Sequence, residues 1–295
     1  MNFGQVLTAM VTPFDQNGDV DFNAARLLVN YLIENGTEGL VVSGTTGESP
    51  TLTLEEKVAL FKLVVEEAAG RVPVIAGTGS NNTRASIQLT KLAAEAGVDG
   101  ILLVVPYYNK PSQEGIYQHF KAIAESTVLP VMLYNIPGRC GVNMSVDTVV
   151  RLSKIHNIVA VKEASGNLDA MADIISKTPD HFSLYSGDDG LTLPVLAIGG
   201  TGVVSVASHI IGNEMQDMVR KFKNGQLEEA AAAHRTLLPL MKGLFAAPNP
   251  TPVKAALNMT GIHVGEVRLP LVPLTDEEKL TLEKLLPADK LVSVS

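Results

Sequence analysis

The sequence predicts an α/β protein, a (β/α)8 TIM barrel with a C-terminal helical annex. Short runs rich in Val, Ile and Leu, apolar on both faces, alternate with segments of helical periodicity along the first two thirds of the chain. Such runs are typical of buried parallel strands, which need a helical crossover between them. A doubly wound open sheet alternates in the same way, but the count of eight strand-helix units favours a closed barrel.

The strands are predicted from β-branched runs that end at turn residues. They cover residues 6–12, 39–42, 72–76, 100–105, 130–134, 158–162, 182–186 and 202–205. The helices between them are predicted at 21–34, 54–69, 83–96, 113–125, 145–153, 168–176 and 191–198. For the helix at 54–69, Thr53 is the expected N-cap and Gly70 the expected stop.

The chain after the last strand carries only helical patterns. Helices are predicted at 215–222, 227–245, 252–259 and 276–285, with a proline-rich connector at 248–252. This part is too short and too strand-free to suggest an independent enzyme domain. We therefore divide the chain into a barrel at residues 1–212 and a C-terminal helical region at 213–295 that packs on it.

Composition and charge narrow the class of protein. Hydrophobic residues make up 46% and charged residues 18%, which suits a large core. A net charge of −8 and a pI near 5.3 argue against nucleic acid and anionic membranes as partners. The single cysteine, Cys140, suits a reducing compartment, and it is expected to pack in the core. No signal peptide is recognisable, so we expect a cytoplasmic protein.

The strand at 158–162 ends in a lysine, Lys162. On the period-two rule Ile158, Ala160 and Lys162 share one face of this strand. Barrels place their chemistry at the C-terminal ends of strands. Apolar surroundings lower the pKa of a lysine, and the neutral amine attacks carbonyls to form a Schiff base. The alternatives are a lysine that reaches solvent at the strand end, or an ion pair with a neighbour such as Glu163.

The loops after other strands carry polar groups that suit a small anionic substrate. Thr45 and Thr46, between glycines, are suited to cradle a carboxylate, and an ordinary tight loop with capping hydroxyls is the alternative. Tyr134 ends the strand before that of Lys162 and is placed to shuttle protons. Arg139 follows it and is suited to bind a second carboxylate, although a surface charge is the more common fate of an arginine.

The remaining loops after the strands give weaker indications of a ligand. The glycine-rich loops at 186–190 and 199–202 leave room for a ligand near the backbone, and phosphate is an alternative ligand there. The two aspartates in the first loop would repel phosphate, and helix capping is their simpler role. The six histidines lack metal-ligand spacing, and no Gly-x-Gly-x-x-Gly follows a strand, so we predict neither a metal nor a cofactor.

Six stretches in register along the whole chain resemble the dihydrodipicolinate synthase family, which belongs to the pyruvate-dependent Schiff-base class I aldolases. The stretches are GTTGE at 44–48, PYYNKPSQEG at 106–115, YNIPGR at 134–139, VKEASGN at 161–167, SGDD at 186–189 and PNPTPVK at 248–254. Each alone is a weak signal, and six in order are a strong one. The resemblance implies condensation of pyruvate with L-aspartate 4-semialdehyde to 4-hydroxy-tetrahydrodipicolinate, in lysine and diaminopimelate biosynthesis.

The resemblance also implies catalytic roles. Lys162 would form the imine with pyruvate. The enzyme would be a lyase that needs no cofactor. Thr45, Tyr134 and Tyr108 would form a proton relay, with Tyr108 supplied by a neighbouring subunit of a homotetramer built as a dimer of dimers. A protonated imine withdraws electrons, so the pyruvate methyl can lose a proton and attack an aldehyde as an enamine.

The substrate-binding roles follow from the same resemblance. Thr46, together with Thr45, would hold the pyruvate carboxylate. Arg139 would bind the carboxylate of the semialdehyde at the entrance, and Gly187 and Val204 would line the pocket through their backbone.

The sequence departs from family members that lysine inhibits. Those members have two histidines and a glutamate at a cleft between subunits, where this chain has Leu54, Lys57 and Ala85. Asn81 and Tyr107 of that cleft are present. Loss of the carboxylate removes the partner of the inhibitor's ammonium groups, so we predict weak or absent feedback by lysine.

Two other functions compete with this one. N-acetylneuraminate lyase and 2-keto-3-deoxy-sugar-acid aldolases share the lysine and the tyrosine, but Thr45–Thr46, Tyr108 and Arg139 favour the synthase. A non-catalytic barrel that senses a ligand would have no need of the lysine, the relay and the arginine together.

Overall fold

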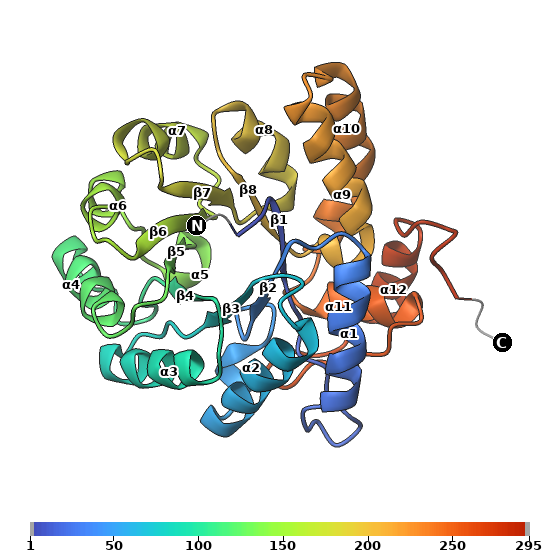
Figure 1. The fold of residues 1–295 in the computed structure, drawn as a ribbon. Coiled ribbons are helices and arrows are strands. Elements are labelled where there is room, and N and C mark those ends of the chain that lie inside the picture. Colours follow the sequence, from blue (N-terminus) through green and yellow to red (C-terminus); the bar gives the residue numbers. More distant parts are fainter. Residues whose placement is uncertain (1–2, 293–295) are drawn as a thin grey trace.

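Eight parallel strands form a closed barrel in which each strand pairs with its sequence neighbours and β8 pairs with β1 (Figure 1). The computed structural model describes residues 3–292. The strands are β1 Val6–Ala9, β2 Gly39–Val42, β3 Val74–Gly77, β4 Gly100–Val104, β5 Val131–Asn135, β6 Ile158–Glu163, β7 Ser183–Ser186 and β8 Gly202–Ser205. This architecture confirms the predicted fold class.

Helices surround the barrel, with further helices after β8 gathered on one side of it (Figure 1). Those between the strands are α1 Phe22–Glu34, α2 Leu54–Ala68, α3 Thr83–Glu95, α4 Gln113–Ala124, α5 Pro137–Cys140, α6 Val146–Leu152, α7 Leu168–Lys177 and α8 Thr192–Ala197. Those after β8 are α9 Ser208–Lys223, α10 Leu227–Gly243, α11 Thr251–Met259 and α12 Asp276–Glu283. Two short 3-10 helices, η1 Ser49–Thr51 and η2 Asp189–Leu191, follow β2 and β7.

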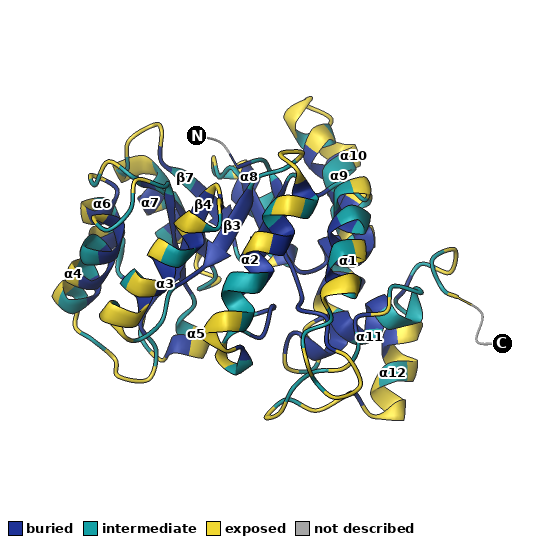
Figure 2. Ribbon diagram, turned by 60° about the horizontal axis from the view of Figure 1, so that its bottom comes forward, coloured by how far each residue is buried: buried dark blue, intermediate teal, exposed yellow. Residues whose placement is uncertain are grey.

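Side chains from the strands build two separate apolar clusters, because successive residues of a strand face opposite sides. The barrel interior holds a small cluster to which all eight strands contribute: Leu7, Ala9, Val41, Ile75, Leu102, Met132, Tyr134, Ala160, Tyr185 and Val204, with Phe3. A larger cluster fills the space between the strands and the helices. Figure 2 shows the buried strands inside and the exposed helix faces outside.

The strand that carries the lysine is irregular at its start. Val131 pairs with Ile158, but the next residue, Met132, pairs with Ala160, so β6 has a bulge there. As a result Ile158 packs in the outer cluster, whereas Ala160 lies in the barrel interior. The prediction that Ile158 shares a face with Ala160 was therefore wrong, because an extra residue shifts the alternation.

The helix ends agree with the capping signals of the sequence. The Thr53 side chain accepts from the Glu56 N–H and the Glu56 carboxylate accepts from the Thr53 N–H, which confirms the predicted cap of α2. Helix α9 begins at Ser208, earlier than predicted, and has a kink at Ile211. The short helix α5 was not predicted. The division of the chain at residue 212 stays a prediction.

The helices after β8 pack on each other and on the barrel: α9 contacts α10 and β1, and α11 contacts α9 and α12. Among the described residues, no helix has both the length and the apolarity needed to cross a membrane.

Candidate active site

Lys162 lies in the barrel interior near the C-terminal end of β6. The strand register places it between Tyr134 of β5 and Tyr185 of β7. Its side chain is nearly buried, and Nζ lies 4.2 Å from the centre of the Tyr134 ring. Among the described residues no hydrogen-bond acceptor holds this ammonium group. Glu163, the ion-pair partner considered above, instead accepts from Asn135 and the Ser165 N–H.

Burial lowers the pKa of Lys162 to about 8. The negative charge of Asp189 acts against this change, and the positive charge of Arg139 adds to it. A fraction of the amine is therefore neutral near neutral pH, which is the form that attacks a carbonyl carbon.

Gly187, after β7, gives the lysine its space. A Cβ at this position would lie 3.0 Å from Cε of Lys162 and 2.6 Å from Cβ of Ala164. Only glycine lets the backbone come so close. The predicted place of Gly187 beside the site thus has a steric reason.

Tyr134 connects the lysine to the loop after β2. It is buried, and burial raises the pKa of its phenol to about 12 against the opposing effects of the Arg139 charge and a hydrogen bond with the Thr45 side chain. Thr45, Tyr134 and Lys162 thus follow one another in space. A chain of two hydroxyls next to an amine can move a proton to and from a bound molecule.

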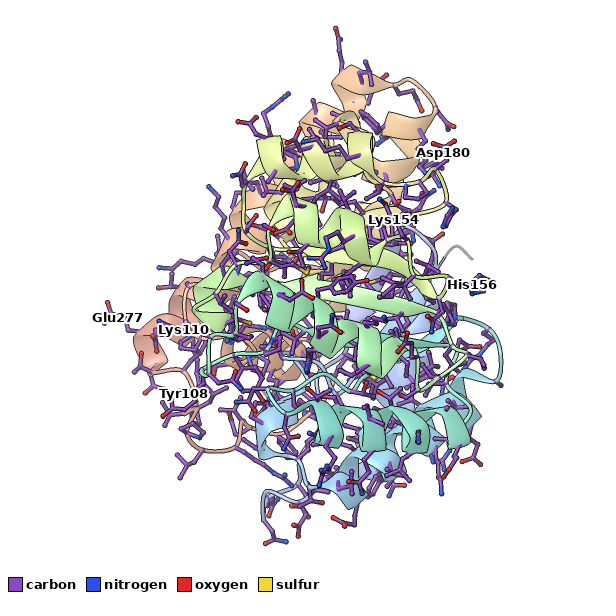
Figure 3. All side chains as sticks on the ribbon, turned by 90° about the vertical axis from the view of Figure 1, so that its left-hand side faces the viewer. Tyr108, Lys110, Lys154, His156, Asp180 and Glu277 are labelled. Carbon is purple, nitrogen blue, oxygen red and sulfur yellow. The ribbon has the colours of Figure 1, made fainter. Side chains whose placement is uncertain are left out.

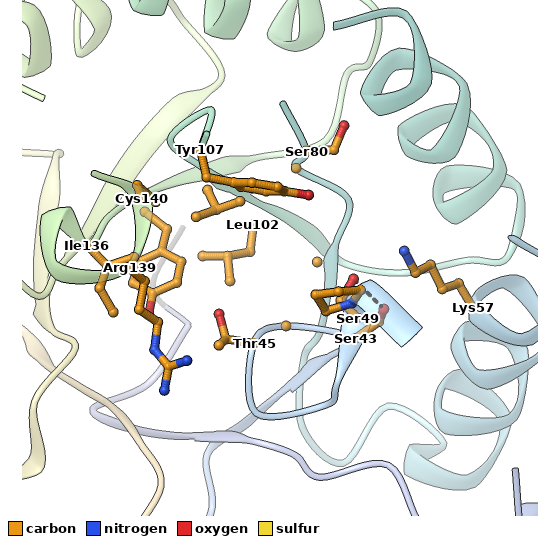
Figure 4. A pocket seen from close by; sticks show the side chains of 16 residues that line it. Ser43, Thr45, Ser49, Lys57, Ser80, Leu102, Tyr107, Ile136, Arg139 and Cys140 are labelled. Atoms are coloured by element: carbon orange, nitrogen blue, oxygen red, sulfur yellow. Dashed lines mark hydrogen bonds between the residues drawn. The ribbon is translucent and has the colours of Figure 1, made fainter. Parts of the chain in front are cut away.

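A cavity of about 250 Å³ opens next to these residues (Figure 4). Thr45, Tyr134 and Arg139 line it, and Tyr107, Ser43 and Ser80 add polar groups. In Figure 4 Arg139 and Lys57 lie on opposite sides of the cavity.

A second cavity, of about 510 Å³, lies against Gly187 and the helix α10, with Arg139 in its wall as well. The Arg139 guanidinium therefore borders both spaces, and it is exposed apart from a 3.5 Å hydrogen bond from Nη2 to the Asn249 carbonyl.

The other predicted site residues lie at different depths. Thr46 is buried, and its hydroxyl accepts a 2.9 Å hydrogen bond from Nδ2 of Asn249. Val204 is buried in the barrel interior.

Tyr108 lies apart from the cavity of its own chain: its side chain is 89% exposed, and its backbone is left-handed with φ of +72°. Figure 3 shows Tyr108 and Lys110 at one end of the barrel, opposite Lys154, His156 and Asp180.

Two sets of buried charged side chains were not predicted from the sequence. Asp189 is buried, and its carboxylate accepts a hydrogen bond from the Ser205 hydroxyl. It also accepts from the Val206 and Ala207 N–H groups, each at 3.0 Å. Only Asp188 has the predicted capping role, on Gly190. Burial raises the pKa of the Asp189 carboxyl.

The second set is the pair of Glu48 and Lys254, 3.1 Å apart and both buried. Both residues belong to stretches that carry the family resemblance, and this resemblance was the only feature of the sequence that could have pointed to the pair. In the described part of the chain no cluster of three or more His, Cys, Asp or Glu side chains is arranged to hold a metal ion.

The fold and this site define a barrel enzyme with a buried, deprotonatable lysine at the end of its sixth strand. Residues 2–289 match the model of the Dihydrodipicolinate synthetase family, and the chain belongs to this family. The prediction of the family is confirmed, as is that of an enzyme, a lyase of this family.

Relatives and solved structures agree closely. The 4-hydroxy-tetrahydrodipicolinate synthase 1 of Halalkalibacterium halodurans is 68% identical over 96% of either chain. The crystal structure of a dihydrodipicolinate synthase from Bacillus anthracis is 64% identical, covers 97% of this chain and 98% of its own, and superposes with a TM-score of 0.95. The enzyme from Cyanidioschyzon merolae, solved with lysine bound, is 51% identical over 96% of this chain and 97% of its own, with a TM-score of 0.95.

Proposed function

We propose that this chain condenses pyruvate, held as an imine on Lys162, with L-aspartate 4-semialdehyde to give 4-hydroxy-tetrahydrodipicolinate. The observation that carries the proposal is the environment of Lys162, a buried amine with a pKa of about 8 and no acceptor among the described residues, 4.2 Å from the Tyr134 ring. The names of the relatives support the same reaction.

The chemistry needs only groups of this chain and its substrates. The neutral Lys162 amine attacks the ketone carbon of pyruvate, and loss of water leaves a protonated imine. The methyl group then loses a proton to give an enamine, whose carbon attacks the aldehyde carbon. The new alkoxide takes up a proton, and attack of the substrate's own amine on the imine carbon closes the ring and releases Lys162.

Protons in this sequence pass through Tyr134 and Thr45. Their hydrogen bond, and the position of the phenol next to Nζ of Lys162, support a relay. Tyr108 of a neighbouring copy completes the relay. Its exposure and left-handed backbone support a contact outside its own chain. The family resemblance supports a homotetramer, a dimer of dimers, as the assembly in which this contact is made.

The two carboxylates have separate holders. Thr45 and Thr46 bind that of pyruvate, deep in the site. Arg139, exposed between the two cavities, binds that of the semialdehyde. Gly187 and Val204 supply the wall. The product serves lysine and diaminopimelate biosynthesis in the cytoplasm.

The closest competitors are aldolases that take a sugar as the acceptor. Arg139 at the entrance and the paired threonines favour an acceptor that carries a carboxylate. A ligand sensor without activity would not need a deprotonatable lysine at this position.

The test measures consumption of pyruvate by the purified protein with L-aspartate 4-semialdehyde, and separately with N-acetylmannosamine. Consumption with the semialdehyde alone is expected. Preference for the amino sugar would overturn the acceptor and keep Lys162, whereas no consumption and no borohydride-trapped pyruvate on Lys162 would overturn the reaction.

A further inference from the structure

The start of helix α11 and the connector before it touch the loop after β2 at two points. Nδ2 of Asn249 donates a 2.9 Å hydrogen bond to Oγ1 of Thr46, and Nζ of Lys254 lies 3.1 Å from Oε1 of Glu48. All four side chains are buried. The partners are 203 and 206 residues apart in the sequence, so the last third of the chain acts directly on this loop.

The hydrogen bond from Asn249 fixes how Thr46 can act. A hydroxyl offers one proton and accepts on its oxygen. Because Asn249 donates to the oxygen, and no other described group accepts from the hydroxyl, the Thr46 proton is left for an incoming acceptor. The other end of the amide, Oδ1 of Asn249, is buried without a partner, so Thr46 is the only side chain that the amide contacts by a hydrogen bond in the described structure.

Lys254 holds the backbone on the far side of Thr46. Its side chain is 1% exposed, and its ammonium group donates to Glu48, to the Thr12 carbonyl at 3.0 Å and to the Glu266 carbonyl at 2.7 Å. The Thr12 hydroxyl in turn donates to the Gly47 carbonyl at 2.7 Å. Glu48 has a left-handed backbone, with φ of +55°, a conformation that side-chain-bearing residues hold only where their surroundings enforce it.

We propose that Asn249 and Lys254 are positioning residues for the pyruvate carboxylate. Asn249 directs the Thr46 proton toward the carboxylate, and Lys254, through Glu48, holds the turn that presents Thr45 and Thr46. The inference rests on the proposed function, since it takes this loop as the pyruvate site. It assigns part of that site to the C-terminal helical region.

The experiment titrates pyruvate against borohydride trapping on Lys162, measured by intact-protein mass spectrometry without the second substrate. For Asn249→Ala we expect the half-saturating pyruvate concentration to rise about tenfold, as for one lost hydrogen bond to a charged group. In a background of Thr46→Val the same change should add little, because both act on one hydroxyl. Asn258→Ala is the matched control: this asparagine lies on α11, close in sequence to Asn249, but among the described residues its side chain bonds only to the backbone of Gly265 and Val264.

The Asn249→Asp variant separates an effect of hydrogen-bond direction from an effect of side-chain shape. Aspartate fills nearly the same space, so a purely structural role predicts a small effect. As an acceptor it would take the Thr46 proton and repel the substrate carboxylate, and we expect the largest rise in the half-saturating concentration for this variant.

Lys254 is tested by the pair Glu48→Gln with Lys254→Met, which removes the ion pair without leaving a lone buried charge. We expect a several-fold rise in the half-saturating pyruvate concentration in the folded protein. Unchanged half-saturation in Asn249→Asp and in the pair, with melting curves that show folded protein, would overturn the inference. Failure of the parent chain to trap pyruvate would overturn the proposed function, and the inference with it.

Discussion

Lys162 and Lys254 are alike in almost every property except one. Both are buried, burial lowers the pKa of each to about 8, and each ammonium lies 4.2 Å from the centre of an aromatic ring. Lys254, however, bonds to a carboxylate and two carbonyls. Lys162 has no hydrogen-bond acceptor among the described residues.

This difference separates a structural lysine from a reactive one. Three acceptors hold the Lys254 nitrogen and occupy its donors, so the amine has neither freedom nor an exposed lone pair. Lys162 bears a similar cost of burial, opposed by the charge of Asp189 but by no hydrogen-bond acceptor among the described residues, and it lies beside residues that line both cavities. A lowered pKa alone therefore does not identify a nucleophile; the missing acceptors and the adjacent space do.

Replacing Lys162 by Met should have the largest effect on activity. The imine cannot form without the amine, so turnover should fall by at least about 10³-fold. Steady-state rates of pyruvate consumption check this, with circular dichroism as the control for folding. A variant with a tenth of the parent rate would mean that the comparison has selected the wrong lysine.

Replacing Lys254 by Met should have the largest effect on stability. It leaves Glu48 buried without its partner, and such changes cost about 3–5 kcal/mol of the free energy of unfolding. Denaturant titration measures the loss. Adding Glu48→Gln should restore most of it, and a double variant as unstable as the single one would contradict the account of the pair.

Lys162→Met should change stability in the opposite direction. The pKa of Lys162 lies below that of an unfolded lysine, so the unfolded chain binds more protons between about pH 8 and 10.5, and below pH 8 the fold bears the full cost of the buried charge. Removing the charge should raise the free energy of unfolding at pH 7 by on the order of 2 kcal/mol. A loss of stability instead would show that Lys162 has a partner.

The pH dependence of adduct formation gives a smaller but direct signal. The initial rate of pyruvate trapping should rise about tenfold per pH unit below pH 7 and level off above about pH 8, as the neutral amine becomes the main form. Quenched reactions with borohydride measure it. A rate still rising past pH 10 would indicate an amine with an ordinary pKa.

Free lysine should have the smallest effect. Lys57 lines the first cavity, burial lowers its pKa, and its charge disfavours an approaching ammonium group, while Leu54 and Ala85 offer no carboxylate. Initial rates with added L-lysine should therefore show no inhibition at sub-millimolar concentrations. Strong inhibition would show that other groups near Lys57 recognise free lysine.

The local sequence pattern was sufficient to predict the barrel and the residues next to Lys162. The strand spacing predicted eight strands, and the ends of adjacent parallel strands necessarily bring Tyr134 and Lys162 side by side. The bulge at the start of β6 escaped, because one inserted residue changes the facing of Ile158 without changing the composition of the run.

The contacts that hold the site together were beyond local reasoning. Helix capping was the predicted role of Asp189, but its carboxylate accepts from the Ser205 hydroxyl and from the backbone after β8, sixteen to eighteen residues away. Asn249 and Lys254 stood in a stretch that the sequence marked only as a stiff connector and a family resemblance. Periodicity reports which face of an element is apolar, and it carries no information on which distant loop that element meets.

The reach of residues 249–254 back to the loop after β2 has a consequence for synthesis on the ribosome. All eight strands and Lys162 are synthesised before Asn249 and Lys254. At that stage the turn that carries Thr45 and Thr46 is still without the two side chains that contact it from residues 249 and 254. On this proposal competence for the first substrate is among the last properties that the chain acquires, because a chain that ends before residue 249 has the amine of Lys162 but neither Asn249 nor Lys254.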